Sequence, residues 1–312
     1  MDAIGRDEQD ATKGRFVDDL SWFAPLLAPA WLLPGVSKDA ARVELAAERW
    51  PEETPLDQDG RDLRQGLPLF LAEGIRYLTN ALPSVRPEPV ASFGERAGAG
   101  ISILTSIVAG HPPVIKVRLM DAAFGLERDS IEREVESDAD LGAVLVSLPR
   151  ATTDALRSTG VRSSWDSRYS PPPPASAARV VRGHRACVRL CDPGSFISES
   201  ADRRAAARDE ARLVLRRLAD AATSTSEALP AVLFFATLVG ATRAGFDATN
   251  DFRMSVNARC MEATDPRDPV FRLSVIALRT IGDEAIAERR AHQLEAVEDP
   301  SFQDWLERAR KA

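Results

Sequence analysis

The chain has 312 residues, a formal net charge of −7 and 44% hydrophobic residues, enough for packed cores in roughly two domains. It holds only three histidines, three cysteines and two tyrosines, whose side chains perform most acid–base, nucleophilic and metal chemistry near neutral pH. The net negative charge disfavours binding to nucleic acid, and the scarcity of reactive side chains disfavours an enzymatic function.

The N-terminal region combines a polar start with an apolar segment. Residues 1–15 are expected to be disordered and show no secretory leader, so the cysteines are expected to be reduced in the cytoplasm. Residues 20–36 are strongly apolar, but three prolines make them too short and too broken to span a membrane. Arginine far outnumbers lysine, which indicates a GC-rich, bacterial genome.

This apolar segment must be sheltered from water, either by its own domain or by another subunit. It is the strongest indication of assembly in the sequence. The residues predicted to form the interface are Trp22, Phe23, Leu26, Leu27, Trp31, Leu32 and Leu33.

Residues 16–157 are predicted to form a helical region followed by mixed structure. The spacing of apolar residues predicts helices over 37–50 and 62–82, each ended by a proline. Short β-branched runs predict strands over 101–110 and 114–121, with a short helix as the alternative for the first run. The same patterns predict a helix over 129–136 and a strand over 142–148.

Residues 158–178 are rich in serine and contain four consecutive prolines, which favour extended polyproline geometry. We expect a linker or long surface loop here, which separates an N-terminal domain (16–157) from a C-terminal domain (179–312). A docking motif for a proline-binding partner is the alternative, although flanking specificity residues are missing.

The C-terminal domain is predicted to alternate strands and helices. Alternating residues predict a strand over 179–191, and Ser198 is expected to cap a helix that runs to about residue 222. The apolar run 228–241 fits a buried helix or a buried strand, and we favour the helix. Further strands are predicted over 252–262 and 270–281 as an antiparallel hairpin, before closing helices at 283–297 and 300–311.

This order predicts an α+β protein with two subdomains and a helical N-terminal region. A mixed or antiparallel sheet is expected, with helices packed on one face. No internal repeat is evident.

Known site patterns are incomplete in this sequence. His184, Cys187, Cys191 and Cys260 are the residue types of a zinc site, but a strand over 179–191 would separate them, so no metal is expected. The glycine-rich segment 94–100 lacks the third glycine of a dinucleotide fingerprint and the GK[ST] ending of a P-loop. We therefore expect no cofactor.

Polar residues at the ends of elements offer the best candidate for a catalytic or ligand-binding site. Asp192 and Ser195 precede a helix N-terminus, where free N–H groups can hold an anion, and further polar residues precede the expected hairpin. Turn and capping duties explain the same residues. The candidate site comprises Asp192, Ser195, Arg243, Asp247 and Asp251, with Asn250 beside them.

The sequence leaves three hypotheses for the function of the protein. The first is a non-enzymatic structural or scaffold subunit of a cytoplasmic assembly, which contacts a protein partner or a second copy through the apolar N-terminal segment. The second is an enzyme or small-ligand-binding domain with the carboxylate and arginine site. The third is nucleic-acid binding through Arg182, Arg185 and Arg189, which the net charge disfavours.

Overall fold

The computed structural model describes the chain in segments, and the following account concerns these residues. They are 41–49, 58–86, 89–91, 100–108, 112–122, 124–162, 169–190, 200–243, 249–297, 303 and 307. The chain forms two compact units. The sheet unit comprises Gly35–Val188 and Glu199–Val214, and the helical unit comprises Met1–Pro34, Arg189–Ser198 and Leu215–Ala312.

The sheet unit is built on a five-stranded mixed sheet with the order β2-β1-β3-β4-β5. β1 pairs in parallel with β2 and β3, whereas the β3–β4 and β4–β5 pairs are antiparallel. The strands are β1 (Arg42–Ala47), β2 (Leu82–Val85), β3 (Ile101–Val108), β4 (Val114–Asp121) and β5 (Glu127–Glu134).

The register of the strands separates an apolar face from a charged one. Leu45 is the partner of Ile103, and Ile103 is the partner of Leu119, so these buried side chains share one face. On the other face, β4 presents Lys116 and Arg118, which pair with glutamates of β5, and Arg118 also pairs with Glu48, which follows β1. β4 therefore alternates in burial with a period of two, whereas β1 and β3 are buried on both faces, and Ala46 and Leu104 form a small apolar cluster on the second face.

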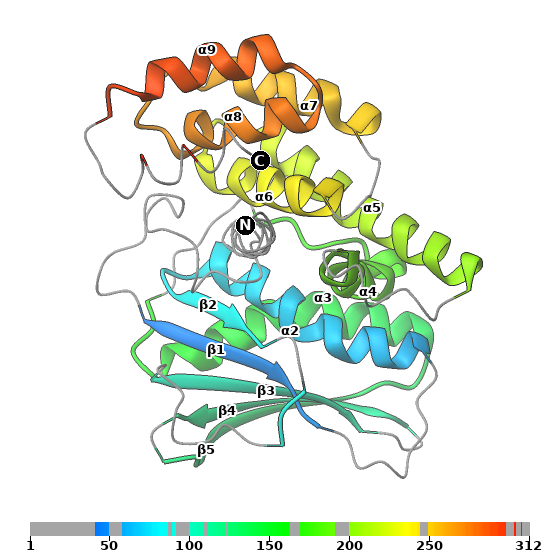
Figure 1. The fold of residues 1–312 in the computed structure, drawn as a ribbon. Coiled ribbons are helices and arrows are strands. Elements are labelled where there is room, and N and C mark those ends of the chain that lie inside the picture. The colour runs from blue at the N-terminus through cyan, green and yellow to red at the C-terminus, as the bar shows by residue number, and fades with distance from the viewer. Residues whose placement is uncertain are drawn as a thin grey trace, which may run out of the picture. The chain divides into compact units, whose positions relative to one another are not determined.

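Helices α2 (Gln58–Leu78) and α3 (Asp138–Arg157) cover one face of the sheet (Figure 1). α2 lies over β1, β2 and β3, and α3 lies against β4 and β5. Almost every residue of α2 from Leu63 onward is buried, so this helix lies in the middle of the unit. Ser137 caps α3 by accepting a hydrogen bond from the backbone N–H of Asp140.

Helices α4 (Pro174–Leu190) and the first part of α5 (Ala201–Ser224) form the next layer of the sheet unit. α4 approaches α2 so closely that a Cβ on Gly66 would lie 2.0 Å from the carbonyl oxygen of Val181. A Cβ on Gly183 would likewise lie 2.4 Å from the carbonyl oxygen of Glu210 in α5. Only glycine permits these approaches of backbone to backbone.

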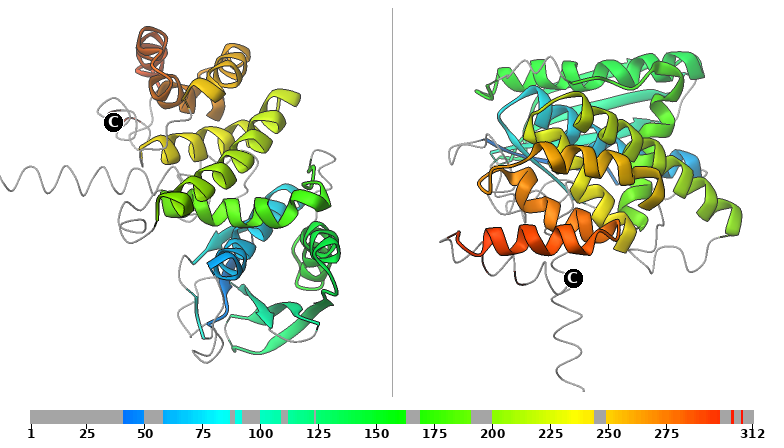
Figure 2. Two further views of the ribbon diagram at one scale, coloured as in Figure 1. Left: turned by 90° about the vertical axis from the view of Figure 1, so that its right-hand side faces the viewer. Right: turned by 90° about the horizontal axis from the view of Figure 1, so that it is seen from above.

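The helical unit contains the rest of α5 with α6 (Ala228–Arg243), α7 (Thr249–Glu262), α8 (Pro269–Thr280) and α9 (Glu284–Leu294) (Figure 2). α8 contacts α6, α7 and α9, and eight of its residues are buried. Asp268 begins α8 by accepting a hydrogen bond from the N–H of Val270 at 2.8 Å. α6 is apolar on all sides and is buried accordingly.

The predicted α+β class is confirmed, and so are several individual elements. The helix expected at 62–82 is α2, and the strands expected at 101–110 and 114–121 are β3 and β4. In the C-terminal part, the long helix after Ser198 and the favoured helix at 228–241 are α5 and α6. The expected N-terminal helical material before residue 41 lies outside the described residues.

Three elements of the N-terminal half differ from the predictions. Residues 42–47 form β1 and not part of a helix over 37–50, because their hydrogen bonds to β2 on one side and to β3 on the other hold them extended. Residues 127–134 form a strand where a helix over 129–136 was expected. Residues 138–157 form α3 where a strand over 142–148 was expected, since the run GAVLVSLP fits a buried helix face equally well.

The predictions for 179–191, 252–262 and 270–281 were also wrong, because all three segments are helices. Their alternation coincided with helical stripes: in α7, Phe252, Val256 and Cys260 are four residues apart and buried together. No hairpin forms, and the second of the two Asp–Pro sequences, Asp268–Pro269, begins α8 instead.

The Pro/Ser-rich segment 158–178 is only partly extended. Residues 169–173 carry no regular structure, but α4 begins at Pro174, the last of the four prolines. Proline suits this first helical position, because its fixed φ is helical and its missing N–H would have no partner within the helix. The sheet unit includes residues on both sides of the segment.

In the part of the chain that the structure describes, helices with enough length and apolar character to cross a membrane are absent.

Candidate functional site

The polar site predicted from the sequence is not brought together by the described residues. Asp192, Ser195 and Asp247 lie outside them, as does the side chain of Arg243 at the end of α6. Asp251 is exposed in the first turn of α7, where a carboxylate stabilises the positive end of the helix. The site stays a prediction, and Asp251 has a capping position that explains it without a ligand.

The predicted interface in the apolar N-terminal segment, from Trp22 to Leu33, also lies outside the described residues. The structure adds exposed apolar side chains that the sequence analysis did not select. Met254 and Met261 on α7 are 84% and 70% exposed. Phe124 and Leu126, between β4 and β5, are 76% and 65% exposed. Large apolar groups that remain in water are candidates for contact with another molecule.

The basic stretch at 182–189 does not form a phosphate-binding face. Arg182 is half-buried and donates from Nε to Glu210 at 2.7 Å. Burial raises the pKa of Glu210, although the hydrogen bond from Arg182 opposes this shift. Arg185 is half-buried and Arg189 is buried. Arginines that bind nucleic acid through its phosphates need an exposed face, which this helix does not offer them.

The histidine and cysteines that were considered as zinc ligands do not lie where the sequence analysis placed them. His184 and Cys187 lie one turn apart on α4 rather than on opposite faces of a strand, and Cys260 belongs to α7 in the helical unit. Cys191 lies outside the described residues. Among the described residues, no group of three or more His, Cys, Asp or Glu is placed to hold a metal ion.

The structure instead reveals a buried acid–base pair in the sheet unit. Glu73 of α2 and His184 of α4 are 1% and 0% exposed. The distance from His184 Nε2 to Glu73 Oε2 is 2.8 Å, and His184 Nδ1 lies 2.7 Å from the carbonyl oxygen of Val180. The ring of Phe70 packs against the imidazole with an edge-to-face geometry and a centroid distance of 5.8 Å.

The hydrogen-bond partners determine where protons lie in this pair. The carbonyl of Val180 can only accept, so Nδ1 of His184 must donate its proton there. Nε2 therefore meets Glu73 Oε2 across one further proton, held either by the imidazolium or by the carboxylic acid. Both groups are fully buried, and their hydrogen bond joins α2 to α4 inside the sheet unit.

Sequence reasoning missed the Glu73–His184 pair because it read 179–191 as a strand. The spacing of Val180, His184 and Cys187 fits one face of a helix and could have indicated α4. Nothing in the sequence relates this segment to Glu73, which lies 111 residues away.

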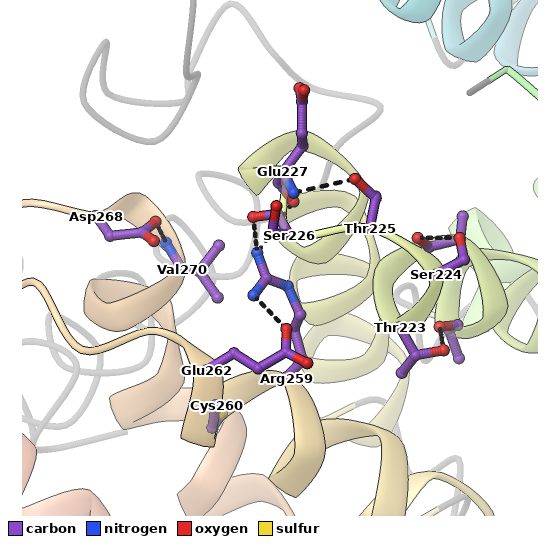
Figure 3. A network of polar contacts seen from close by, with 12 residues as sticks. Thr223, Ser224, Thr225, Ser226, Glu227, Arg259, Cys260, Glu262, Asp268 and Val270 are labelled. Carbon is purple, nitrogen blue, oxygen red and sulfur yellow. Dashed lines mark hydrogen bonds and ion pairs between the residues drawn. The ribbon is translucent and has the colours of Figure 1, made fainter. Parts of the chain in front are cut away.

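The helical unit has a polar centre of a different kind, formed by two arginines that bind main-chain carbonyls, of which Figure 3 shows Arg259. Arg259 of α7 is 2% exposed and donates from Nη2 to the carbonyl oxygens of Ser226 and Glu227 at 2.5 and 3.1 Å. Its Nη1 donates to the carboxylate of Glu262 at 3.0 Å. Arg259 thereby ties α7 to the connection that precedes α6.

Arg290 of α9 also joins helices, because it bonds to one residue of α7 and one residue of α8. It donates to the carbonyl oxygen of Cys260 and to Ser274 Oγ, and its guanidinium lies 4.4 Å from the centroid of the Phe271 ring. Burial lowers the pKa of Arg290 and raises the pKa of the Cys260 thiol to about 12, although Arg290 opposes the latter shift. Cys260 is therefore an unreactive thiol at neutral pH.

None of the models of known protein families matches the chain, and a search of curated proteins gives no match either.

Proposed function

We propose that the protein is a non-enzymatic structural or scaffold subunit of a protein assembly in the cytoplasm, and that it contacts its neighbours through apolar surfaces. The observation that carries the proposal is the exposed stripe of α7. Met254, Ala258 and Met261 follow one another at spacings of four and three residues, and all are exposed. This spacing places them on one side of the helix.

A second copy of the chain is the neighbour that the observations favour. One chain carries both an apolar N-terminal segment, with Trp22 and Trp31, and the exposed stripe on α7. When one copy presents both members of a complementary pair, two copies can exchange them around a twofold axis. Methionine suits such a contact, because its flexible side chain adapts to irregular apolar partners.

The buried ionisable groups support a structural role. Glu73 and His184 bond to one another, and Arg259 and Arg290 bond to main-chain carbonyls. These groups connect helices inside each unit.

Sedimentation velocity over a wide concentration range tests this proposal. The wild-type protein is expected to self-associate. Met254→Lys together with Met261→Lys should weaken association at least tenfold, because burial of a methionine side chain contributes about 1.5–3 kcal/mol. Trp22→Ser together with Trp31→Ser should act in the same direction. The matched control is Ala205→Lys with Ala206→Lys, which adds the same charge at exposed positions of α5.

The proposal is overturned by a protein that is monomeric at all concentrations and whose residues 20–36 are protected from hydrogen exchange within the single chain. Weakening by the control variant to the same extent would also contradict it, since charge alone would then explain the effect.

A further inference from the structure

A separate surface lies at the β5 edge of the sheet. β5 is the outermost strand in the order β2-β1-β3-β4-β5, and among the described residues only β4 pairs with it (Figure 1). Alternate residues of such a strand direct their N–H and C=O groups away from the sheet, where another strand can bind them. Seven of its eight residues are exposed, and Ile131 alone is buried.

The charge around this edge is strongly acidic. Residues 124–140 contain seven acidic and two basic side chains, a net charge of −5 compared with −7 for the whole chain. Lys116 pairs with Glu132 at 2.6 Å and Arg118 lies 3.8 Å from Glu127. Among the described residues, none forms an ion pair with Asp129 or Glu134. The edge therefore carries a net negative potential toward solvent.

A well-formed turn holds two apolar side chains at one end of the strand. The buried carboxylate of Asp121 accepts from the N–H of Phe124 at 3.3 Å and from Arg128. The N–H of Asp121 donates to the carbonyl oxygen of Leu126 at 2.8 Å, and Gly125 adopts a φ of 63° that suits glycine. Phe124 and Leu126 are thus exposed beside a set of hydrogen bonds that joins the end of β4 to the start of β5.

We propose that the β5 edge binds a basic, extended segment of a partner protein, which adds as a further strand, with Phe124 and Leu126 as apolar anchors. The main-chain groups of β5 supply hydrogen bonds for strand addition. The acidic side chains select lysine and arginine on the partner. They oppose pairing of β5 with the β5 of a second copy, because like charges would lie opposite one another.

The probe for the test is a labelled nonapeptide of alternating lysine and valine, whose binding is measured by fluorescence anisotropy. The full-length protein should bind it more weakly as salt rises. Asp129→Lys with Glu134→Lys should weaken binding at least tenfold, and so should Phe124→Ser with Leu126→Ser. Two further peptides serve as comparisons: one alternates glutamate and valine, and the other has prolines in place of two valines, which removes strand hydrogen bonds.

Asp202→Lys with Asp220→Lys is the matched protein control, because it changes the net charge equally at exposed positions of α5. Hydrogen exchange of the β5 amides should slow when the lysine–valine peptide is bound. Equal affinity for the proline peptide would reduce the interaction to attraction between charges and overturn strand addition. Equal weakening by the α5 control, or absence of binding by the wild-type protein, would overturn the proposal as well.

This inference is independent of the proposed self-association. The Met254→Lys and Met261→Lys changes on α7 should leave peptide affinity unchanged, and the β5 variants should leave sedimentation unchanged. Failure of one proposal is thereby distinguished from failure of the other.

Discussion

The sheet unit and the helical unit satisfy their buried polar groups in different ways. The sheet unit uses two side chains, Glu73 and His184, which come from α2 and α4 and need a proton between them. The helical unit uses Arg259 and Arg290, which donate to main-chain carbonyls. A carbonyl is present at every residue, whereas a matching side chain must be specified. The first arrangement therefore depends on two positions in the sequence and the second mainly on one.

The largest expected effect tests the arginines of the helical unit. Arg259→Met keeps much of the apolar stem but leaves the carbonyls of Ser226 and Glu227 without their charged donor, so we expect a loss of about 3 kcal/mol in the free energy of unfolding. Urea denaturation followed by circular dichroism measures it. The control is Arg267→Met at an exposed position, expected to change stability by less than about 0.5 kcal/mol. Equal effects of the two variants would contradict the assigned role of Arg259.

The next effect concerns the acid–base pair of the sheet unit. Glu73→Leu leaves Nε2 of His184 buried without a polar partner at this position and should lower the free energy of unfolding by about 2 kcal/mol. Glu73→Gln should cost less than about 1 kcal/mol, because either end of the amide can pair with Nε2, whichever atom holds the proton. Urea denaturation of both variants at neutral pH makes the comparison. If glutamine were as harmful as leucine, the hydrogen bond to His184 would not be what Glu73 contributes.

The smallest effect over the range of the test, pH 8 to pH 10, is a pH dependence in the helical unit. The pKa of Cys260 is raised from 9.0 to about 12 in the folded protein, so the thiol stays protonated there while it ionises in the unfolded chain. Its contribution to stability is complete below pH 9.0 and is lost as the pH rises toward 12, with a slope of about 1.4 kcal/mol per pH unit.

Urea denaturation of the wild type and of Cys260→Ala between pH 8 and pH 10 isolates this contribution. The stability difference between the two proteins should be constant up to about pH 9 and should then shrink as the pH rises. A constant difference over the whole range would show that Cys260 ionises equally in both states, and the account of its burial would then be wrong.

The extent to which the sequence predicted the fold depended on how specific each pattern was. α2 was predicted because apolar residues recur at spacings of three and four from Leu63 to Leu78, which a strand cannot place on one face. β3 and β4 were predicted because β-branched residues dominate two short runs. α4 and α7 were wrongly predicted as strands, because an alternating pattern over about a dozen residues is compatible with the two-residue period of a strand and with the 3.6-residue period of a helix.

The candidate sites also divide into those that the sequence predicted and those that only the structure revealed. The apolar N-terminal segment was found by composition and the polar cluster near Asp192 by its place at the ends of predicted elements, and both remain predictions. The Glu73–His184 pair, the arginines of the helical unit and the exposed side chains of α7 and the β4–β5 turn became apparent only in three dimensions. Each of them depends on contact, or on lack of contact, between segments that are distant in the chain.

By itself, the sequence determined the α+β class, the acidic surface, the scarcity of reactive side chains and the helices with long apolar periodicity, because these are local or summed properties of residues. The tertiary structure decided which ambiguous segments became strands, where β1 lies between β2 and β3, and which polar groups are buried together. The reason is that hydrogen bonds between strands and packing between helices outweigh local preferences of at most about 1 kcal/mol per ordinary residue.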